Sequence, residues 1–146
     1  MTQSIRSILR PLATLAAAGF VIFFIWIVVI ADRGNGTPWW SFIDRIPSGD
    51  KVGHLCLVST LCFLCNFAFP VRNSRFLPRY VTLVTFLLFS ALSLEELSQA
   101  FIPSRHLDFF DWLADLAGLG IGQTFASRFR KSVATIRICN GRLESD

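Results

Sequence analysis

Four long apolar segments, separated by short polar ones, dominate the pattern of the chain. About 20 apolar residues, rising roughly 1.5 Å each as a helix, cross the ~30 Å hydrocarbon core of a bilayer. The predicted spans cover residues 12–31, 52–70, 80–103 and 108–127. The first has no charged residue and the second has only a histidine, whereas the third and fourth contain acidic residues. We therefore expect an all-α, polytopic membrane protein whose single domain is a bundle of four transmembrane helices.

The basic residues between these segments predict how the bundle is oriented. Lysine and arginine accumulate on the cytoplasmic side of membrane proteins. Alternating the sides of the four spans places ten of the 14 basic residues on the side of the two termini. Both termini are therefore expected in the cytoplasm, with the chain in the bacterial cytoplasmic (inner) membrane. The basic tail, residues 128–146, is expected either to lie at the membrane interface or to be disordered.

Composition agrees with this interpretation. The chain has 146 residues, is 53% hydrophobic and has a mean hydropathy of +0.53, which is too apolar for an ordinary soluble domain. Its net charge of +4 comes mainly from the cytoplasmic side and indicates contact with lipid headgroups rather than with nucleic acid. Cys62 and Cys65 form a C-x-x-C pair inside an apolar segment. This setting favours packing as small hydrophobic residues over a redox or metal motif.

Ionisable residues from three predicted helices fall at one depth in the membrane. The second helix begins near Asp50, and the third reaches the same level at its last two turns, near Glu96. The fourth helix runs inward from Asp108, which puts Asp115 about 10 Å below that level. The residues expected in this outer third are Asp50, Lys51, His54, Glu95, Glu96, Gln99, Arg105, Asp108, Asp111 and Asp115.

Helical spacing predicts that these side chains point into the bundle. Asp108, Asp111 and Asp115 follow an i, i+3, i+7 pattern and so form one stripe. Gly118 and Gly122 continue the stripe, and small residues at this spacing permit close approach of a neighbouring helix. The acidic face of the fourth helix is therefore also predicted to be its packing face.

A functional site explains so many acidic residues better than packing alone. A charged side chain in mid-membrane costs at least ~2.5–3.5 kcal/mol, whereas an interhelical hydrogen bond contributes only about 0.6 kcal/mol. His54 is a candidate general base, oriented by Asp50 or Glu96, and Lys51 with Arg105 would bind an anionic head. The further catalytic candidates are Glu95 and Asp111, and the further substrate-binding candidates are Gln99, Asp108 and Asp115.

The sequence does not identify a cofactor. Histidine with carboxylate oxygens suits Mg²⁺, Mn²⁺ or Zn²⁺, but the spacing matches no specific metal motif, so no residue is assigned as a metal ligand. The inner half of the bundle offers Asn66 and Gln123 but no charged residue. That pattern argues against an ion pathway and for a site that opens to the outside.

Four short motifs of this polar region resemble those of the VanZ-like family of small bacterial membrane proteins. They are DKVGH (50–54), EELSQ (95–99), IPSR (102–105) and DWLADLAG (111–118). The resemblance implies a helical protein of the cytoplasmic membrane. It also implies a link to the cell envelope, because the founding member of that family is associated with low-level resistance to the glycopeptide teicoplanin. The family often has Asn where this chain has Asp115.

Two functional hypotheses follow. In the first, the outward-facing site binds or acts on a cell-envelope molecule at the outer leaflet, such as a lipid-linked wall precursor or a peptidoglycan stem peptide. In the second, the protein is a non-catalytic accessory subunit whose polar cluster holds the bundle together and presents a surface to a partner membrane protein. Whether the protein is an enzyme stays open between them.

Overall fold

The fold is all-α, as predicted. The computed structural model describes residues 2–33, 48–69, 81–101 and 108–143, and all regular structure in these ranges is helical. The helices are α1 (Thr2–Asp32), α3 (Gly49–Ala68), α4 (Leu83–Gln99) and α5 (Phe109–Leu143). Each overlaps one of the four apolar segments identified in the sequence.

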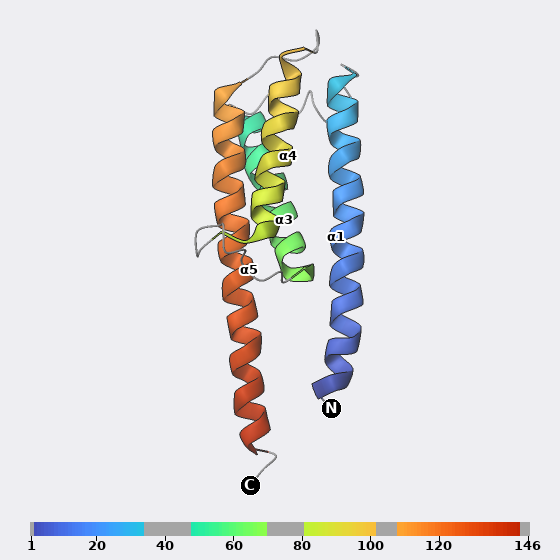
Figure 1. The fold of residues 1–146 in the computed structure, drawn as a ribbon, viewed down its shortest axis with the longest axis vertical. Helices are drawn as coiled ribbons and strands as arrows, with labels where there is room; N and C mark the ends of the chain where they lie inside the picture. The colour runs from blue at the N-terminus through green and yellow to red at the C-terminus, as the bar shows by residue number, and fades with distance from the viewer. Residues whose placement is uncertain (1, 34–47, 70–80, 102–107, 144–146) are drawn as a thin grey trace.

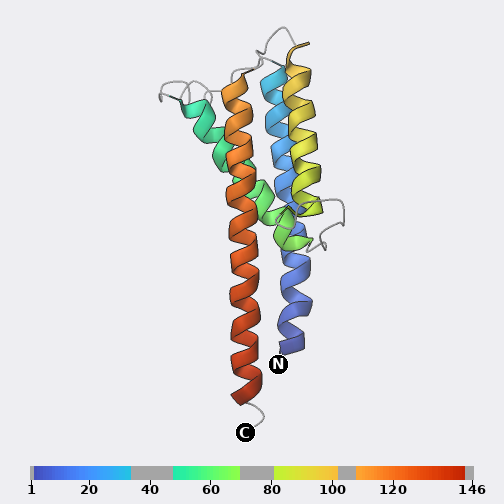
Figure 2. The same ribbon diagram turned by 60° about the vertical axis from the view of Figure 1, so that its left-hand side comes forward.

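The helices lie roughly along one axis, and this arrangement decides which helix ends meet. Helix α1 begins and α5 ends at the lower end of the molecule in Figure 1. Helix α3 begins, α4 ends and α5 begins at the opposite, upper end (Figure 1). Helix α3 contacts each of the other three helices and runs obliquely across the bundle in Figure 2. The polar residues at the start of α3, the end of α4 and the start of α5 are therefore brought to one end, which we call the polar end.

Two glycines allow α3 and α5 to form the most extensive helix pair of the structure. A methyl group added at Gly118 would lie 3.0 Å from the backbone oxygen of Leu55. At Gly122 it would lie 2.8 Å from the Cβ of Cys62 and closer still to the backbone oxygen of Ser59. The predicted continuation of the acidic stripe into a packing face is thus confirmed.

Large apolar side chains cover much of the outside of the bundle, and its interior contains polar residues beside an apolar core. Large exposed hydrophobic residues occur on every helix, for example Ile22, Val52, Leu94 and Phe125, each more than half exposed. The buried polar or charged residues of the described ranges are Asn66, Thr82, Thr85, Glu96, Gln99 and Asp115. In water this distribution would be unfavourable, because exposed apolar area costs free energy while the buried polar groups gain little.

Two helices are long and apolar enough to cross a membrane by length and composition, namely Pro11–Asp32 within α1 and Gly49–Ala68, which is α3. Helix α4 has 17 residues, fewer than the 24 expected for residues 80–103. Helix α5 has 35 residues and continues to Leu143. Disorder, one of the two alternatives expected for the tail at 128–146, is therefore wrong for 128–143, where the backbone extends the same helix. The sequence there contains no proline, so every backbone N–H can continue the helical hydrogen bonding. The interfacial location stays a prediction.

Candidate functional site

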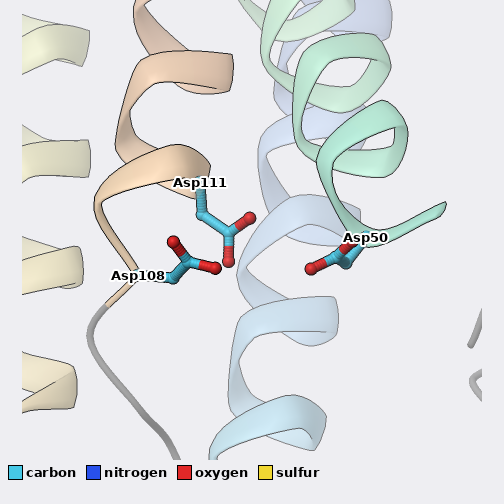
Figure 3. A group of neighbouring side chains, drawn as sticks. All are labelled: Asp50, Asp108 and Asp111. Carbon is cyan, nitrogen blue, oxygen red and sulfur yellow. The ribbon is translucent and has the colours of Figure 1, made fainter. Parts of the chain in front are cut away.

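A lysine surrounded by three aspartates lies at the polar end. The Nζ atom of Lys51 is 2.9 Å from Asp50 Oδ2, 2.8 Å from Asp108 Oδ2 and 3.0 Å from Asp111 Oδ1. Asp50 comes from α3, whereas Asp108 and Asp111 come from the start of α5, and Figure 3 shows the three carboxylates directed toward a common space. The ammonium group has three N–H donors, and each has one carboxylate acceptor. Lys51 thus joins α3 to α5.

This geometry changes two expectations for the cluster. Lys51 was predicted to bind an anionic head, but its three donors already meet carboxylates, so it is not a free anion-binding group. The three carboxylates also satisfy the spacing of a cation site, with one oxygen of each within 4.8 Å of the others. The Lys51 ammonium takes the cation's place among them, so a metal ion would have to displace it.

Asp108 also fixes the beginning of α5. Its Oδ1 accepts a hydrogen bond from the backbone N–H of Phe110 at 2.8 Å, which is the usual side-chain cap of a helix N-terminus. Asp108 precedes α5, and the Lys51 ammonium together with this N–H holds the pKa of its carboxyl group below the ordinary value of 3.8. Asp108 therefore joins the start of α5 to Lys51, and its role in substrate binding stays a prediction.

Glu96 connects α4 to the same point. Its Oε1 accepts a hydrogen bond from the backbone N–H of Asp108 at 3.0 Å, and only 4% of the residue is exposed. The neighbouring Glu95 points elsewhere, as expected from the ~100° step between adjacent helical residues, and its Oε1 accepts from Gln99 Nε2 at 2.9 Å. The two glutamates therefore serve different contacts.

A histidine–aspartate pair lies one turn further into the bundle. His54 Nδ1 is 3.0 Å from Asp115 Oδ1. The Asp115 side chain is 4% exposed and that of His54 is 27% exposed. Among the described residues, no hydrogen bond is made by the second ring nitrogen of His54, Nε2. A carboxylate on Nδ1 favours the tautomer with its proton there, which leaves Nε2 as the base.

The partner of His54 is a correction to the sequence interpretation. Asp50 or Glu96 was expected to orient the imidazole, but Asp50 contacts Lys51 and Glu96 accepts from the backbone N–H of Asp108. Asp115, expected to bind substrate, takes the orienting position. Once Lys51 meets Asp111, the i+4 relation of Asp111 to Asp115 brings Asp115 to His54, because one turn of α5 matches the offset from Lys51 to His54 on α3. Arg105 lies outside the described residues.

A second polar cluster, which the sequence did not reveal as a unit, lies toward the other end of α3. Asn66 Nδ2 donates to Thr85 Oγ1 at 2.9 Å, and Thr82 Oγ1 donates to Asn66 Oδ1. The backbone N–H of Thr82 donates to Gln123 Oε1 at 3.1 Å. Cys62 and Cys65 are free thiols buried nearby, as expected for small packing residues. These neutral contacts join α3, α4 and α5 but contain no acid or base.

Comparisons of the chain with protein-family models, with curated proteins and with solved structures found no match in any of the three. The resemblance to the VanZ-like family therefore remains a prediction from four short motifs.

Proposed function

We propose that the chain is an integral membrane protein whose His54–Asp115 pair, near the outer leaflet of a bacterial cytoplasmic membrane, binds or acts on a cell-envelope molecule. The observation that carries the chemistry is the 3.0 Å contact between a half-buried imidazole and a buried carboxylate. A histidine held in this way is suited to take a proton from a hydroxyl group or from water.

The membrane placement is supported by the distribution of side chains. Large apolar residues face outward on all four helices, while acids such as Glu96 and Asp115 are turned inward. In this proposal all four helices cross the bilayer. The 17 residues of α4 are at the lower limit of the roughly 17–25 required. Helix α5 crosses over residues 109–127, and its later part extends beyond the membrane with the basic residues Arg128 and Lys131. These residues favour a cytoplasmic location for the end with both termini.

The class of target follows from where the pair lies. His54 and Asp115 lie in the first two turns of α3 and α5, which begin at the end of the bundle opposite the termini in Figure 1. The proposed orientation puts this end at the outer leaflet. Molecules present there include lipid-linked wall precursors and peptidoglycan stem peptides. The motifs that resemble the VanZ-like family point to the same compartment and to a link with teicoplanin-type resistance. No step of the proposal requires a metal ion.

The experiment uses purified protein in nanodiscs that contain a lipid-linked wall precursor. Precursor retention and conversion are followed by mass spectrometry for wild type, His54→Gln, Asp115→Asn and Thr60→Val. Thr60 is exposed on the same helix and serves as the matched control. We expect conversion by wild type and Thr60→Val, and a loss of about 100-fold or more in the first two variants, since general-base catalysis contributes roughly 10²–10⁴. Unchanged conversion in His54→Gln would show the mechanism to be wrong.

The arrangement around Lys51 favours a second candidate, a non-catalytic accessory subunit. Lys51 and Glu96 link α3, α4 and α5 through contacts that involve no ligand. In this case wild type retains the precursor or a partner membrane protein but converts nothing. The same nanodisc experiment distinguishes the two, because retention without conversion supports the accessory role and excludes the catalytic one.

A further inference from the structure

An open groove runs between α4 and α5 at the polar end. Its volume is about 320 Å³, which is at the small end of the range of ligand sites. The residues that line it are Ser93, Glu96, Leu97, Phe109 and Trp112. Trp112 is held in place, because its Nε1 donates to Ser93 Oγ at 3.1 Å and its ring stacks on Phe109 with centroids 5.8 Å apart. The groove thus has largely apolar walls, in which Trp112 contacts Ser93 and Phe109.

Glu96, one of the residues that line this groove, has an unpaired carboxylate oxygen. Glu96 is 4% exposed, and its Oε1 accepts from the backbone of Asp108, but Oε2 has no hydrogen-bond partner among the described residues. A buried carboxylate oxygen without a partner costs about 1–3 kcal/mol or more, so such atoms are rare. The unpaired oxygen indicates that a donor from another molecule belongs beside it.

We propose that this groove binds a membrane lipid with a primary ammonium headgroup, of the phosphatidylethanolamine class, with the ammonium at Glu96 Oε2 and an acyl chain along Trp112. The proposal deepens the proposed function and rests on its membrane placement.

The charge of the region selects this occupant. Around Glu96, the described acids Glu95, Asp108, Asp111 and Asp115 outnumber the one lysine, and that lysine is already paired with three carboxylates. An anionic lipid without an ammonium group would meet repulsion here, and a trimethylated head has no N–H to donate. Glu96 lies three residues before the end of α4, so it is about 4.5 Å below that end, near headgroup level. Tryptophan side chains such as Trp112 are enriched at the same level.

The test measures lipid retention by native mass spectrometry after purification from membranes and exchange into defined mixtures. The lipids are phosphatidylethanolamine, phosphatidylglycerol and phosphatidylcholine of identical acyl chains. Glu96→Gln is the informative variant, because the amide oxygen can still accept from Asp108 N–H while the negative charge is removed. Leu97→Trp obstructs the groove, and Leu94→Trp is its control, since Leu94 is similarly exposed on α4 but does not line the groove.

We expect wild type and Leu94→Trp to retain phosphatidylethanolamine at least fivefold over the other two lipids, and Glu96→Gln and Leu97→Trp to lose that preference. Equal retention of the three lipids by wild type, or an unchanged preference in Glu96→Gln, would overturn the proposal. His54→Gln separates this result from the proposed function, because it should keep the lipid preference while losing precursor conversion. Loss of the protein from membranes on alkaline extraction would instead reject the membrane placement on which both depend.

Discussion

Lys51 determines how the acidic residues of the polar end are held together. Its side chain is 28% exposed, so its part-buried ion pairs with Asp108 and Asp111 are screened less than the exposed pair with Asp50. Exposed ion pairs contribute roughly 0.2–1 kcal/mol, whereas breaking a buried pair costs roughly 3–5 kcal/mol. Lys51 lies between these limits, and it neutralises repulsion among Asp50, Asp108 and Asp111.

Replacing Lys51 by methionine is therefore expected to reduce the free energy of unfolding by about 1–3 kcal/mol. The measurement is denaturant titration in mixed micelles. Lys51→Arg, which keeps the charge, should lose less. Adding Asp50→Asn to Lys51→Met should restore part of the loss, because one unpaired carboxylate is removed. A double variant no more stable than Lys51→Met would contradict the electrostatic explanation.

The same substitution tests whether the lysine takes the place of a cation. In Lys51→Met the three carboxylates keep one oxygen each within a metal-binding spacing, but the competing ammonium is gone. A cation at a hundred times its Kd stabilises a protein by about 2.7 kcal/mol, equivalent to roughly 5–10 °C in Tm for a chain of this size. We expect Mn²⁺ to raise the Tm of Lys51→Met by about this amount and that of wild type by much less. An equal response in both proteins would show that Lys51 does not compete with the ion.

The sequence identified which residues lie at the polar end better than it identified which of them contact each other. Depth along a helix follows from residue number, so Asp50, His54 and Asp115 could be placed in one region. Which carboxylate meets His54 depends on the rotation and tilt of α5 against α3, and a difference of one helical turn separates Asp111 from Asp115. Residue spacing within one helix contains no information about that offset.

The close approach of α3 and α5 depends on individual glycines of α5. At Gly122 an added methyl group would contact backbone atoms of Ser59 and Phe63, which cannot move without shifting the whole of α3. At Gly120, on the same helix, an added methyl group has nothing within 4 Å. The two positions therefore separate a packing effect from the general effect of alanine on a helix.

Gly122→Ala is expected to destabilise the protein by about 1–3 kcal/mol, as overpacking does elsewhere. Gly120→Ala should be neutral or should stabilise by up to about 1 kcal/mol, because alanine favours the helix. Both are measured by denaturant titration under the same conditions. Equal effects of the two substitutions would mean that α3 and α5 are not in close contact at Gly122.

The sequence predicted the positions of the helices better than their lengths. The apolar pattern located all four helices, because a helix satisfies the backbone hydrogen bonds of a long apolar segment within the segment itself. It did not place the end of α5, where basic residues such as Arg128 and Lys131 follow the apolar part without interrupting helical hydrogen bonding. Polarity signals where a span leaves the membrane, but it does not signal where a helix stops.

The molecule as a whole combines an apolar core with buried polar groups and an exposed apolar surface. Buried groups such as Asn66 and Asp115 are polar, while Ile22 and Phe125 are exposed. The exposed surface of α1 is the extreme case, because only 6% of its apolar window is buried within the protein. Lipid around the helices, as proposed above, would make this distribution favourable.

The arrangement of the helix ends predicts which positions share a side of the membrane. Ser48 is exposed at the start of α3, at the polar end, whereas Cys139 lies near the end of α5, at the other end. We compare a variant with Cys139 as its single cysteine to one in which Cys139 is replaced by serine and Ser48 by cysteine. A membrane-impermeant maleimide added to intact cells should label the Ser48→Cys variant and spare Cys139, and inverted vesicles should give the reverse pattern. Labelling of both positions from one side would mean that the bundle does not cross the bilayer. In that case the exposed apolar surface would need a protein partner rather than lipid to cover it.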